Sequence, residues 1–510
     1  MADDLRAPRG MHDLLPEDAA LWAHIRDTAE AVAHRFGYRP IATPIVEDAK
    51  VFLRTAGEES DIVQKEVYLF EDRGNDRLAL RPEGTAGVCR AYLEHGMGSW
   101  PQPVRLFYFG PFFRYDRPQA GRYRQLWQFG AEAIGSDSPA LDAELIDLQA
   151  TIYREVGLTN IVPRINSIGT AATRARYVEA LRAHFAPHVT TLSRDSQRRY
   201  ETNILRVLDS KEDAAHPAVA GAPSILDFLD DSDREHFEAV KAHLDALGIA
   251  YEVDPRIVRG LDYYSRTVWE FEPRDAAGSQ GAVGAGGRYD GLIELLGGPH
   301  TPAVGFGAGV DRIALNMKAQ GVLPPLSAID IYLVVPDPAY FGRALAIADQ
   351  IRASGAAVIV GDASRSASAQ RRHATQVGAR QWAWIGKNEV DSGRVTPRDL
   401  IQGEDFEEGL PVDGDAIAAE TGWRRIIRAL YEYYGPEANG LSGTELVEKA
   451  LSDERLEGLA YQIRASRRWR NEVVHGRVTL SAEKWWLSHT YEEVLVRELR
   501  LRPRPSNPPR

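Results

Sequence analysis

The sequence predicts an α+β protein of several domains, the first of them built on an antiparallel sheet with helices. Three observations support this. A length of 510 residues suggests about three domains, residues 104–135 alternate as two antiparallel strands around a turn, and short strand and helix patterns alternate over 326–410. We expect a first domain over 1–325, an α/β domain over 326–410, an all-α domain over 413–500 and a disordered Arg-Pro tail over 501–510.

The composition is that of an ordinary globular protein, with 44% hydrophobic and 26% charged residues. The sequence has no apolar run long enough to span a membrane and no basic-then-apolar start of a signal peptide, so we expect a cytoplasmic protein with no membrane partner. The single cysteine, Cys89, excludes an internal disulfide and a cysteine-built zinc site. Because the net charge is -12, any RNA contact must come from locally clustered arginines.

The elements of the first domain follow from local patterns. Apolar residues at helical spacing predict a helix that ends at Gly37, and prolines at the margins of Pro40–Glu47 predict an extended edge or interface segment. Two short strands over 67–70 and 78–82 flank a turn that contains Gly and Asn, which predicts a hairpin. A further helix opens at Glu83.

The hairpin over 104–135 carries the densest charge. Its turn holds arginines at positions 114, 117, 122 and 124, with only Asp116 nearby to neutralise them. The turn is either a solvated, salt-bridged loop or an anion site, and forked guanidinium donors suit a triphosphate or an RNA backbone. On the second strand, Gln128 and Glu132 are an even number of residues apart and share one face. Polar residues on a core-directed face suggest a pocket for a small, polar, cationic ligand.

A mainly helical insertion over 170–250 follows, with helices expected over 171–185, 197–209 and 233–248. After it, the segment Arg259–Arg266 combines two adjacent tyrosines with an arginine and a carboxylate. The segment is either a binding wall or a structural turn in which the arginine and the carboxylate pair and the tyrosines pack half-buried.

Two glycine-rich segments complete the first domain. The glycines of Gly281–Asp290 permit close backbone approach beside Tyr289, but the strand, helix and acidic residue of a dinucleotide fingerprint are missing. Ala303–Leu315 is typical of a strand passing into a helix, with Arg312 near the helix start. If these segments converge with the arginine hairpin, the site holds a polyanion at one end and a small cationic molecule at the other, as ATP and an amino acid would require. Activation of a carboxylate is then the natural reaction.

The last two domains carry weaker signals. The α/β domain has a modest basic patch, which is either a solvated helix face or an RNA contact, formed by Arg365, Arg371, Arg372 and His373. In the all-α domain, Ser442 to Glu445 form a capping box. An arginine-rich helix beyond it places Asn471 and His475 four residues apart on one face.

Residues 1–410 resemble a histidyl-tRNA synthetase, a class II aminoacyl-tRNA synthetase. Ile41–Ile45 is similar to the first class II motif, a dimer-interface element, and Phe113–Gln125 to the second motif in its histidine-specific form. Leu80–Thr85 resembles the amino-acid-binding turn, Arg259–Tyr264 the histidine-specific signature, and Ala303–Arg312 the third motif. Five motifs in this order make the resemblance specific.

The resemblance implies roles for individual residues. Arg114 and Arg259 would stabilise the ATP α-phosphate from opposite sides as the histidine carboxylate attacks, which makes both catalytic. ATP, a substrate that arrives with Mg²⁺, would be bound by Arg114, Arg122, Arg312 and Asp116. Histidine would be bound by Glu83, Thr85, Gln128, Glu132, Tyr264 and Tyr289. Arg117 and Gln119 would contact the acceptor end of tRNA(His), and we expect a homodimer without a tightly bound, protein-ligated metal.

Two departures and two alternatives belong with this resemblance. Asp116 and Asp311 stand where glutamate is commoner, which predicts altered geometry rather than lost activity. The family also contains non-catalytic, histidine-sensing paralogues.

The C-terminal run Arg470–His475 is similar to the HEPN-domain motif of an arginine, four residues and a histidine. In such a motif, Arg470, Asn471 and His475 would form an RNase site. The chain could then be an RNA-targeting effector, or the helix could be an inert spacer or an extra tRNA contact.

Overall fold

The computed structural model of the protein describes residues 5–499, except for positions 56–65, 209, 211, 258–262, 275–281, 323–328, 354–355, 393, 396–397, 401–409, 412–425, 428, 432, 439–440, 461 and 468–498. The chain forms two compact units, residues 1–326 and 327–510. Among the described residues, no helix combines the length and the apolar character that crossing a membrane requires.

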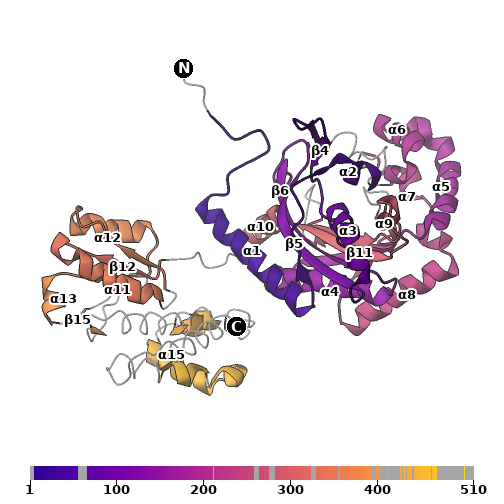
Figure 1. Cartoon of the computed structure of the whole chain (residues 1–510). Coiled ribbons are helices and arrows are strands. Elements are labelled where there is room, and N and C mark those ends of the chain that lie inside the picture. The colour runs from indigo at the N-terminus through magenta and orange to yellow at the C-terminus, as the bar shows by residue number, and fades with distance from the viewer. Residues whose placement is uncertain are drawn as a thin grey trace. The chain divides into compact units, whose positions relative to one another are not determined.

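The first unit is built on an eight-stranded sheet (Figure 1). The six inner strands pair in antiparallel fashion, whereas the two short edge strands, β1 and β8, each pair in parallel with a neighbour. In their order across the sheet the strands are β1 (Arg39–Pro40), β5 (Val104–Phe113), β6 (Gln125–Ile134), β11 (Ala303–Gly309), β10 (Gly284–Arg288), β9 (Ser265–Pro273), β7 (Ile161–Ser167) and β8 (Glu252–Val253).

Alternate strand residues divide between two hydrophobic cores, one on each face of this sheet, because successive side chains of a strand point to opposite faces. On β6, Phe129 and Ala131 enter the first core and Ile134 enters the second. The first face is covered by α1 (Pro16–Arg35), α4 (Pro139–Glu155), α8 (Asp231–Ala246) and α10 (Val310–Ala319). The second face is covered by α3 (Thr85–Glu94), α9 (Leu292–Leu295), α5 (Ala171–Phe185), α6 (Arg194–Thr202) and α7 (Pro217–Ala220).

Smaller elements complete the first unit. A three-stranded antiparallel sheet in the order β2 (Val46–Asp48), β4 (Arg77–Leu80) and β3 (Tyr68–Glu71) packs with α2 (Ala49–Thr55) around its own small core. The short 3-10 helices are η2 (Met97–Ser99), η3 (Ala186–Thr191), η4 (Ile204–Val207) and η5 (Ile225–Phe228).

The second unit contains an α/β part and a helical part. Its four-stranded sheet has the order β13 (Val358–Val360), β12 (Ile331–Val334), β14 (Gln381–Trp384) and β16 (Arg398–Asp399), the first three parallel and β16 antiparallel. The other α/β elements are η6 (Pro338–Tyr340), α11 (Phe341–Ala353), α12 (Ala367–Gln376), α13 (Lys387–Ser392) and the pair β15 (Arg394–Val395) and β17 (Leu410–Pro411). The helical part includes η7 (Gly435–Ala438), α15 (Gly443–Ser452) and η8 (Glu454–Leu459), and it has a separate apolar core.

Most of the expected elements of the first unit are confirmed, and two are corrected. The extended segment over 40–47 is divided between β1 and β2, with residues 41–45 between them. The helix expected over 197–209 begins earlier and ends at Thr202, because Ser193 caps its first turn and Asn203 adopts φ -150° and ψ 89°, outside the helical region. The capping box at the start of α15 is present as expected.

Candidate active site

The centre of the second face holds a buried carboxyl group, Glu132. It lies on β6 and its side chain is fully inaccessible to solvent. It accepts hydrogen bonds from the hydroxyl groups of Tyr289, of Thr85 at 2.7 Å and of Tyr108 at 3.4 Å. Burial raises the pKa of Glu132 from 4.5 to about 8. The three hydroxyl donors oppose this rise, and the negative charge of Glu83 adds to it. The carboxyl is therefore poised to hold or release a proton near neutral pH.

A second buried carboxyl, Glu83, lies at the start of α3. Its oxygens accept the backbone amides of Thr85 at 2.6 Å and Ala86 at 2.9 Å, the first amides of a helix that have no partner inside the helix. Burial raises the pKa of Glu83, while these amides and the nearby charge of Arg114 oppose the rise. Two neighbouring buried carboxyls give this part of the site an affinity for a cation.

Three tyrosine rings border the carboxyl pair. The ring centroid of Tyr263 lies 4.8 Å from that of Tyr264 and 5.8 Å from that of Tyr289. All three side chains are buried. The ring of Tyr264 lies against the backbone of Gly287, where an added Cβ would stand 2.7 Å from the ring. A glycine in β10 thus lets an aromatic ring rest directly on the sheet.

Three arginines form a positively charged group beside the carboxyls. The Nε of Arg114 donates to the Pro82 carbonyl at 2.9 Å, and Arg312 donates to the carbonyls of Gly121 at 3.2 Å and Ala282 at 2.6 Å. Burial lowers the pKa of Arg312, and the positive charges of Arg122 and Arg114 lower it further. The three positive charges therefore repel one another, and an anion bound among them would relieve this repulsion.

The turn of the arginine hairpin is held by local ion pairs. Arg122 pairs with Asp116 and, at 3.6 Å, with Glu66. The expectation that only Asp116 lies near these arginines is therefore wrong, since Glu66, distant in sequence, also reaches the turn. Backbone hydrogen bonds between Gln119 and Arg122 close the tip, where Arg117 and Gln119 are exposed.

The structure thus brings together most of the predicted site residues. Gln128 is half-buried on β6, opposite Gly309 of β11 and Gly110 of β5. The predicted residues Arg259, Arg470, Asn471 and His475 lie outside the described residues. Sequence reasoning missed Tyr108. This residue lies on β5 two positions before Gly110, on the same face of the strand, and that position was a signal that could have found it.

Sequence reasoning also missed a contact made by the segment that precedes α1. The carbonyl of Gly10 accepts the backbone amide of Arg124 at 2.7 Å, and the rings of His12 and Tyr123 lie 4.4 Å apart. The N-terminal segment therefore braces the base of the arginine hairpin. No local pattern in the sequence indicated this contact.

Comparisons with known proteins place the chain in a family. A family model described as histidyl-tRNA synthetase matches residues 10–313. The histidine--tRNA ligase of Dehalococcoides mccartyi is 44% identical over 410 residues, which cover 80% of this chain and 97% of that protein. Apo histidyl-tRNA synthetase of S. aureus, a solved structure, is 34% identical, has a TM-score of 0.68, and is matched over 82% of this chain and 99% of its own.

A more distant structure shares the fold alone. It is named an ATP phosphoribosyltransferase regulatory subunit/histidyl-tRNA synthetase from Bacillus halodurans C, is 21% identical with a TM-score of 0.56, and is matched over 76% of this chain and 99% of its own. The family model spans well over half of this chain, and the relative from Dehalococcoides mccartyi is matched over nearly its whole length. The chain belongs to the histidyl-tRNA synthetase family.

Proposed function

We propose that the protein activates histidine with ATP to form histidyl-adenylate and pyrophosphate, and then transfers the histidyl group to the 3' end of tRNA(His). The observation that carries this proposal is the grouping of a buried carboxyl pair with three nearby arginines, in a chain of this family. The carboxyl pair suits a cationic amino acid, and the arginines suit a triphosphate.

Histidine occupies the carboxyl end of this group. Its ammonium contacts Glu83, Thr85 and Gln128, and its imidazole contacts Glu132, Tyr264 and Tyr289. A carboxyl with a pKa of about 8 can accept a hydrogen bond from a ring N–H or donate one to a bare ring nitrogen. A competitor without ring nitrogens leaves these buried groups unpaired, which disfavours it strongly.

ATP occupies the arginine end, with Mg²⁺ as part of the substrate. Arg114 contacts the α-phosphate, and Arg122 and Arg312 contact the outer phosphates, with Asp116 supporting Arg122. Arg259 approaches the α-phosphate from the opposite side. A histidine carboxylate oxygen attacks the α-phosphorus, pyrophosphate leaves, and the arginines stabilise the charge that builds on the phosphoryl oxygens.

Transfer and assembly use the outer parts of the first unit. The ribose hydroxyl at the tRNA 3' end attacks the histidyl carbonyl, and AMP leaves, while Arg117 and Gln119 at the exposed hairpin tip hold the acceptor end. A homodimer forms through the region of residues 41–45. Exposed apolar side chains in this region and on the small three-stranded sheet beside it support that contact: Ile45 in the first, and Val46, Leu69 and Phe70 in the second.

Histidine-dependent exchange of pyrophosphate into ATP tests the activation step, and charging of tRNA(His) tests the transfer. We expect both activities. Failure of the wild-type protein to exchange pyrophosphate in the presence of histidine would contradict the proposal and favour a histidine-sensing, non-catalytic paralogue. Arg259→His should abolish adenylate formation while changing the Kd for histidine little, since its role is at the α-phosphate.

The C-terminal helices are proposed to form a HEPN-like module. A compact apolar core around Leu430, Leu446 and Ile463 supports a folded helical module in this region. Arg470, Asn471 and His475 would then orient a 2'-hydroxyl and protonate a leaving oxygen. Incubation with tRNA tests this: fragments that vanish in His475→Ala identify a nuclease, and intact tRNA with both proteins leaves a spacer or an extra tRNA contact.

A further inference from the structure

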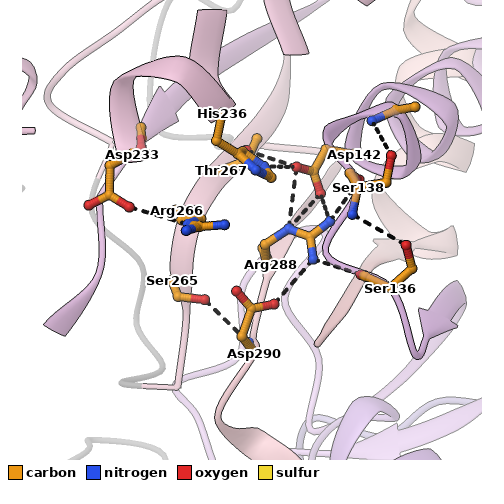
Figure 2. A network of polar contacts seen from close by, with 12 residues as sticks. Ser136, Ser138, Asp142, Asp233, His236, Ser265, Arg266, Thr267, Arg288 and Asp290 are labelled. Atoms are coloured by element: carbon orange, nitrogen blue, oxygen red, sulfur yellow. Dashed lines mark hydrogen bonds and ion pairs between the residues drawn. The ribbon is translucent and has the colours of Figure 1, made fainter. Parts of the chain in front are cut away.

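A fully buried arginine, Arg288, lies on the first face of the sheet, in a network of polar contacts with Asp142 and Asp290 (Figure 2). It is the last residue of β10, and all five of its N–H groups have acceptors. Nε and Nη2 bind Asp142, at 3.1 Å and 2.9 Å. The remaining acceptors, at 3.0 to 3.1 Å, are the carbonyls of Ser136 and Ser138 and the carboxylate of Asp290. Such a guanidinium holds its surroundings in one arrangement.

Asp142 connects this arginine to the helical insertion. It lies in the first turn of α4, is fully buried, and also accepts hydrogen bonds from His236 at 2.5 Å and Thr267 at 3.1 Å. Burial, the largest single influence, raises the pKa of Asp142, but the charges and hydrogen bonds of Arg288 and His236 together outweigh it, so the pKa is lowered. The ionised carboxylate therefore joins β10 to His236 on α8, the last helix of the insertion.

A second arginine reaches the same helix from β9. The pairing of β9 with β10 shifts at Gly287, so that Arg288 pairs with Ser265 and two residues of β9 bulge out. Arg266 within this bulge has φ 51°, a conformation that non-glycine residues rarely adopt. Its guanidinium bonds to Asp233 at 3.2 Å and to the Ser232 hydroxyl at 3.1 Å, both in the first turn of α8.

Both contacts adjoin residues of the proposed histidine site. Tyr289 follows Arg288 directly, yet its hydroxyl bonds to Glu132 on the second face, so the two neighbours act on opposite faces. Tyr264 stands two residues before Arg266, at the strained entry to β9. The position of each tyrosine therefore depends on an arginine that α8 helps to hold.

We propose that Arg288, His236 and Arg266 are positioning residues for histidine selection. Through them, the first two turns of α8 set the positions of Tyr289 and Tyr264, so that the helical insertion and the histidine site are thermodynamically coupled. The inference rests on the proposed function, because it assigns these tyrosines to the histidine ring. It predicts that disturbing α8 at a distance weakens histidine binding without a matching effect on ATP.

His236 is the residue to change, since Arg288→Ala would leave the buried charge of Asp142 without its arginine and risk unfolding. In His236→Ala the Kd for histidine, measured by calorimetry, should rise about tenfold, the size of one lost charged hydrogen bond. The KM for ATP in pyrophosphate exchange should stay within about twofold. His236→Gln, whose amide can still donate to Asp142, should restore most of the affinity.

His243→Ala is the matched control, because His243 lies on the exposed side of the same helix. It should leave both constants unchanged. A Kd for histidine in His236→Ala equal to that of His243→Ala, or an equal rise in the KM for ATP, would overturn the inference while leaving the proposed function intact. A wild-type protein that binds no histidine would overturn both.

Hydrogen exchange supplies a reading that a purely structural role would not change. Because coupling is reciprocal, histidine should slow amide exchange in the first turn of α8 in the wild type, and less so in His236→Ala. Peptides of α11 in the second unit serve as the internal reference. Unchanged exchange in α8 on saturation with histidine would contradict the coupling.

Discussion

The hydroxyl of Tyr289 donates a hydrogen bond to the carboxyl of Glu132 across strand β11, at the point where Gly305 pairs with Glu132. A methyl group on Gly305 would stand 1.6 Å from Oε2 of Glu132 and 2.7 Å from the carbonyl oxygen of Ala131. The two side chains can meet only because the strand between them carries no side chain at this position. The glycine-rich strand is thus part of the site.

Gly305→Ala should therefore displace Glu132 and raise the KM for histidine, by roughly tenfold or more if the Tyr289 bond is lost. The change in KM for ATP should be small. Gly307→Ala is the matched control on the same strand, since the nearest heavy atoms to its added Cβ are 3.9 Å away. Equal histidine KM values for the two variants in pyrophosphate exchange would contradict this role.

The raised pKa of Glu132 predicts a pH dependence of stability. A carboxyl that ionises at about 8 in the folded protein and near 4.5 when unfolded stabilises the fold below pH 4.5, and that contribution is lost as pH rises toward 8. The effect is on the order of a few kcal/mol. Glu132→Gln removes the titration, so its Tm should fall less than that of the wild type between pH 5 and about 8.5. Parallel Tm curves for the two proteins would contradict the assignment.

Gly10→Ala should disturb the arginine hairpin. Gly10 has φ +83°, and its added Cβ would stand 2.8 Å from Cγ of Arg124 and 2.9 Å from Cγ of Pro118. We expect the KM for ATP to rise about tenfold, since the hairpin carries Arg122. Gly37→Ala, at φ +79° with no atom within 4 Å of its Cβ, shares the backbone strain but not the clash. If Gly37→Ala raises the KM for ATP as much as Gly10→Ala does, backbone strain rather than the contact with the hairpin is responsible.

Ser442→Ala should destabilise α15. The Ser442 hydroxyl accepts the Glu445 amide at 3.3 Å, and the Glu445 carboxylate accepts the Ser442 amide at 2.8 Å. Loss of this cap costs about 1 kcal/mol, which faster hydrogen exchange in α15 would report. Pyrophosphate exchange should be unaffected. In the control Ser452→Ala, the lost hydroxyl bonds to the Glu448 carbonyl within the same helix and is not part of its N-terminal cap, so exchange in α15 should change little.

Local periodicity predicted much of the fold and part of the site. The two-residue period of β6 placed Gln128 and Glu132 on one face, and the strand-to-helix pattern placed Arg312 at the start of α10. The limits of the insertion helix α5 are those expected. These features depend on residues that lie close together in the chain.

The network beneath the site depends on distant residues and could not be predicted. Asp142 and Arg288 are separated by 146 positions. In the sequence, Asp142 is an ordinary charged residue near a helix start, and Arg288 is an ordinary charged residue at a strand end. Glu66 likewise lies far before the hairpin in the chain, well removed from Arg122, with which it pairs. Only the folded chain shows which charges are buried and with which partners.

The buried carboxyl pair has a consequence for the chemistry of ligand entry. With a pKa of about 8, Glu132 retains a proton in the empty protein at neutral pH, and a cationic ligand that pairs with the carboxylate must release it. Uptake of such a ligand is therefore also a proton-release reaction. Its heat in a calorimeter will vary with the ionisation enthalpy of the buffer, and its affinity will rise with pH until the carboxyl is fully ionised.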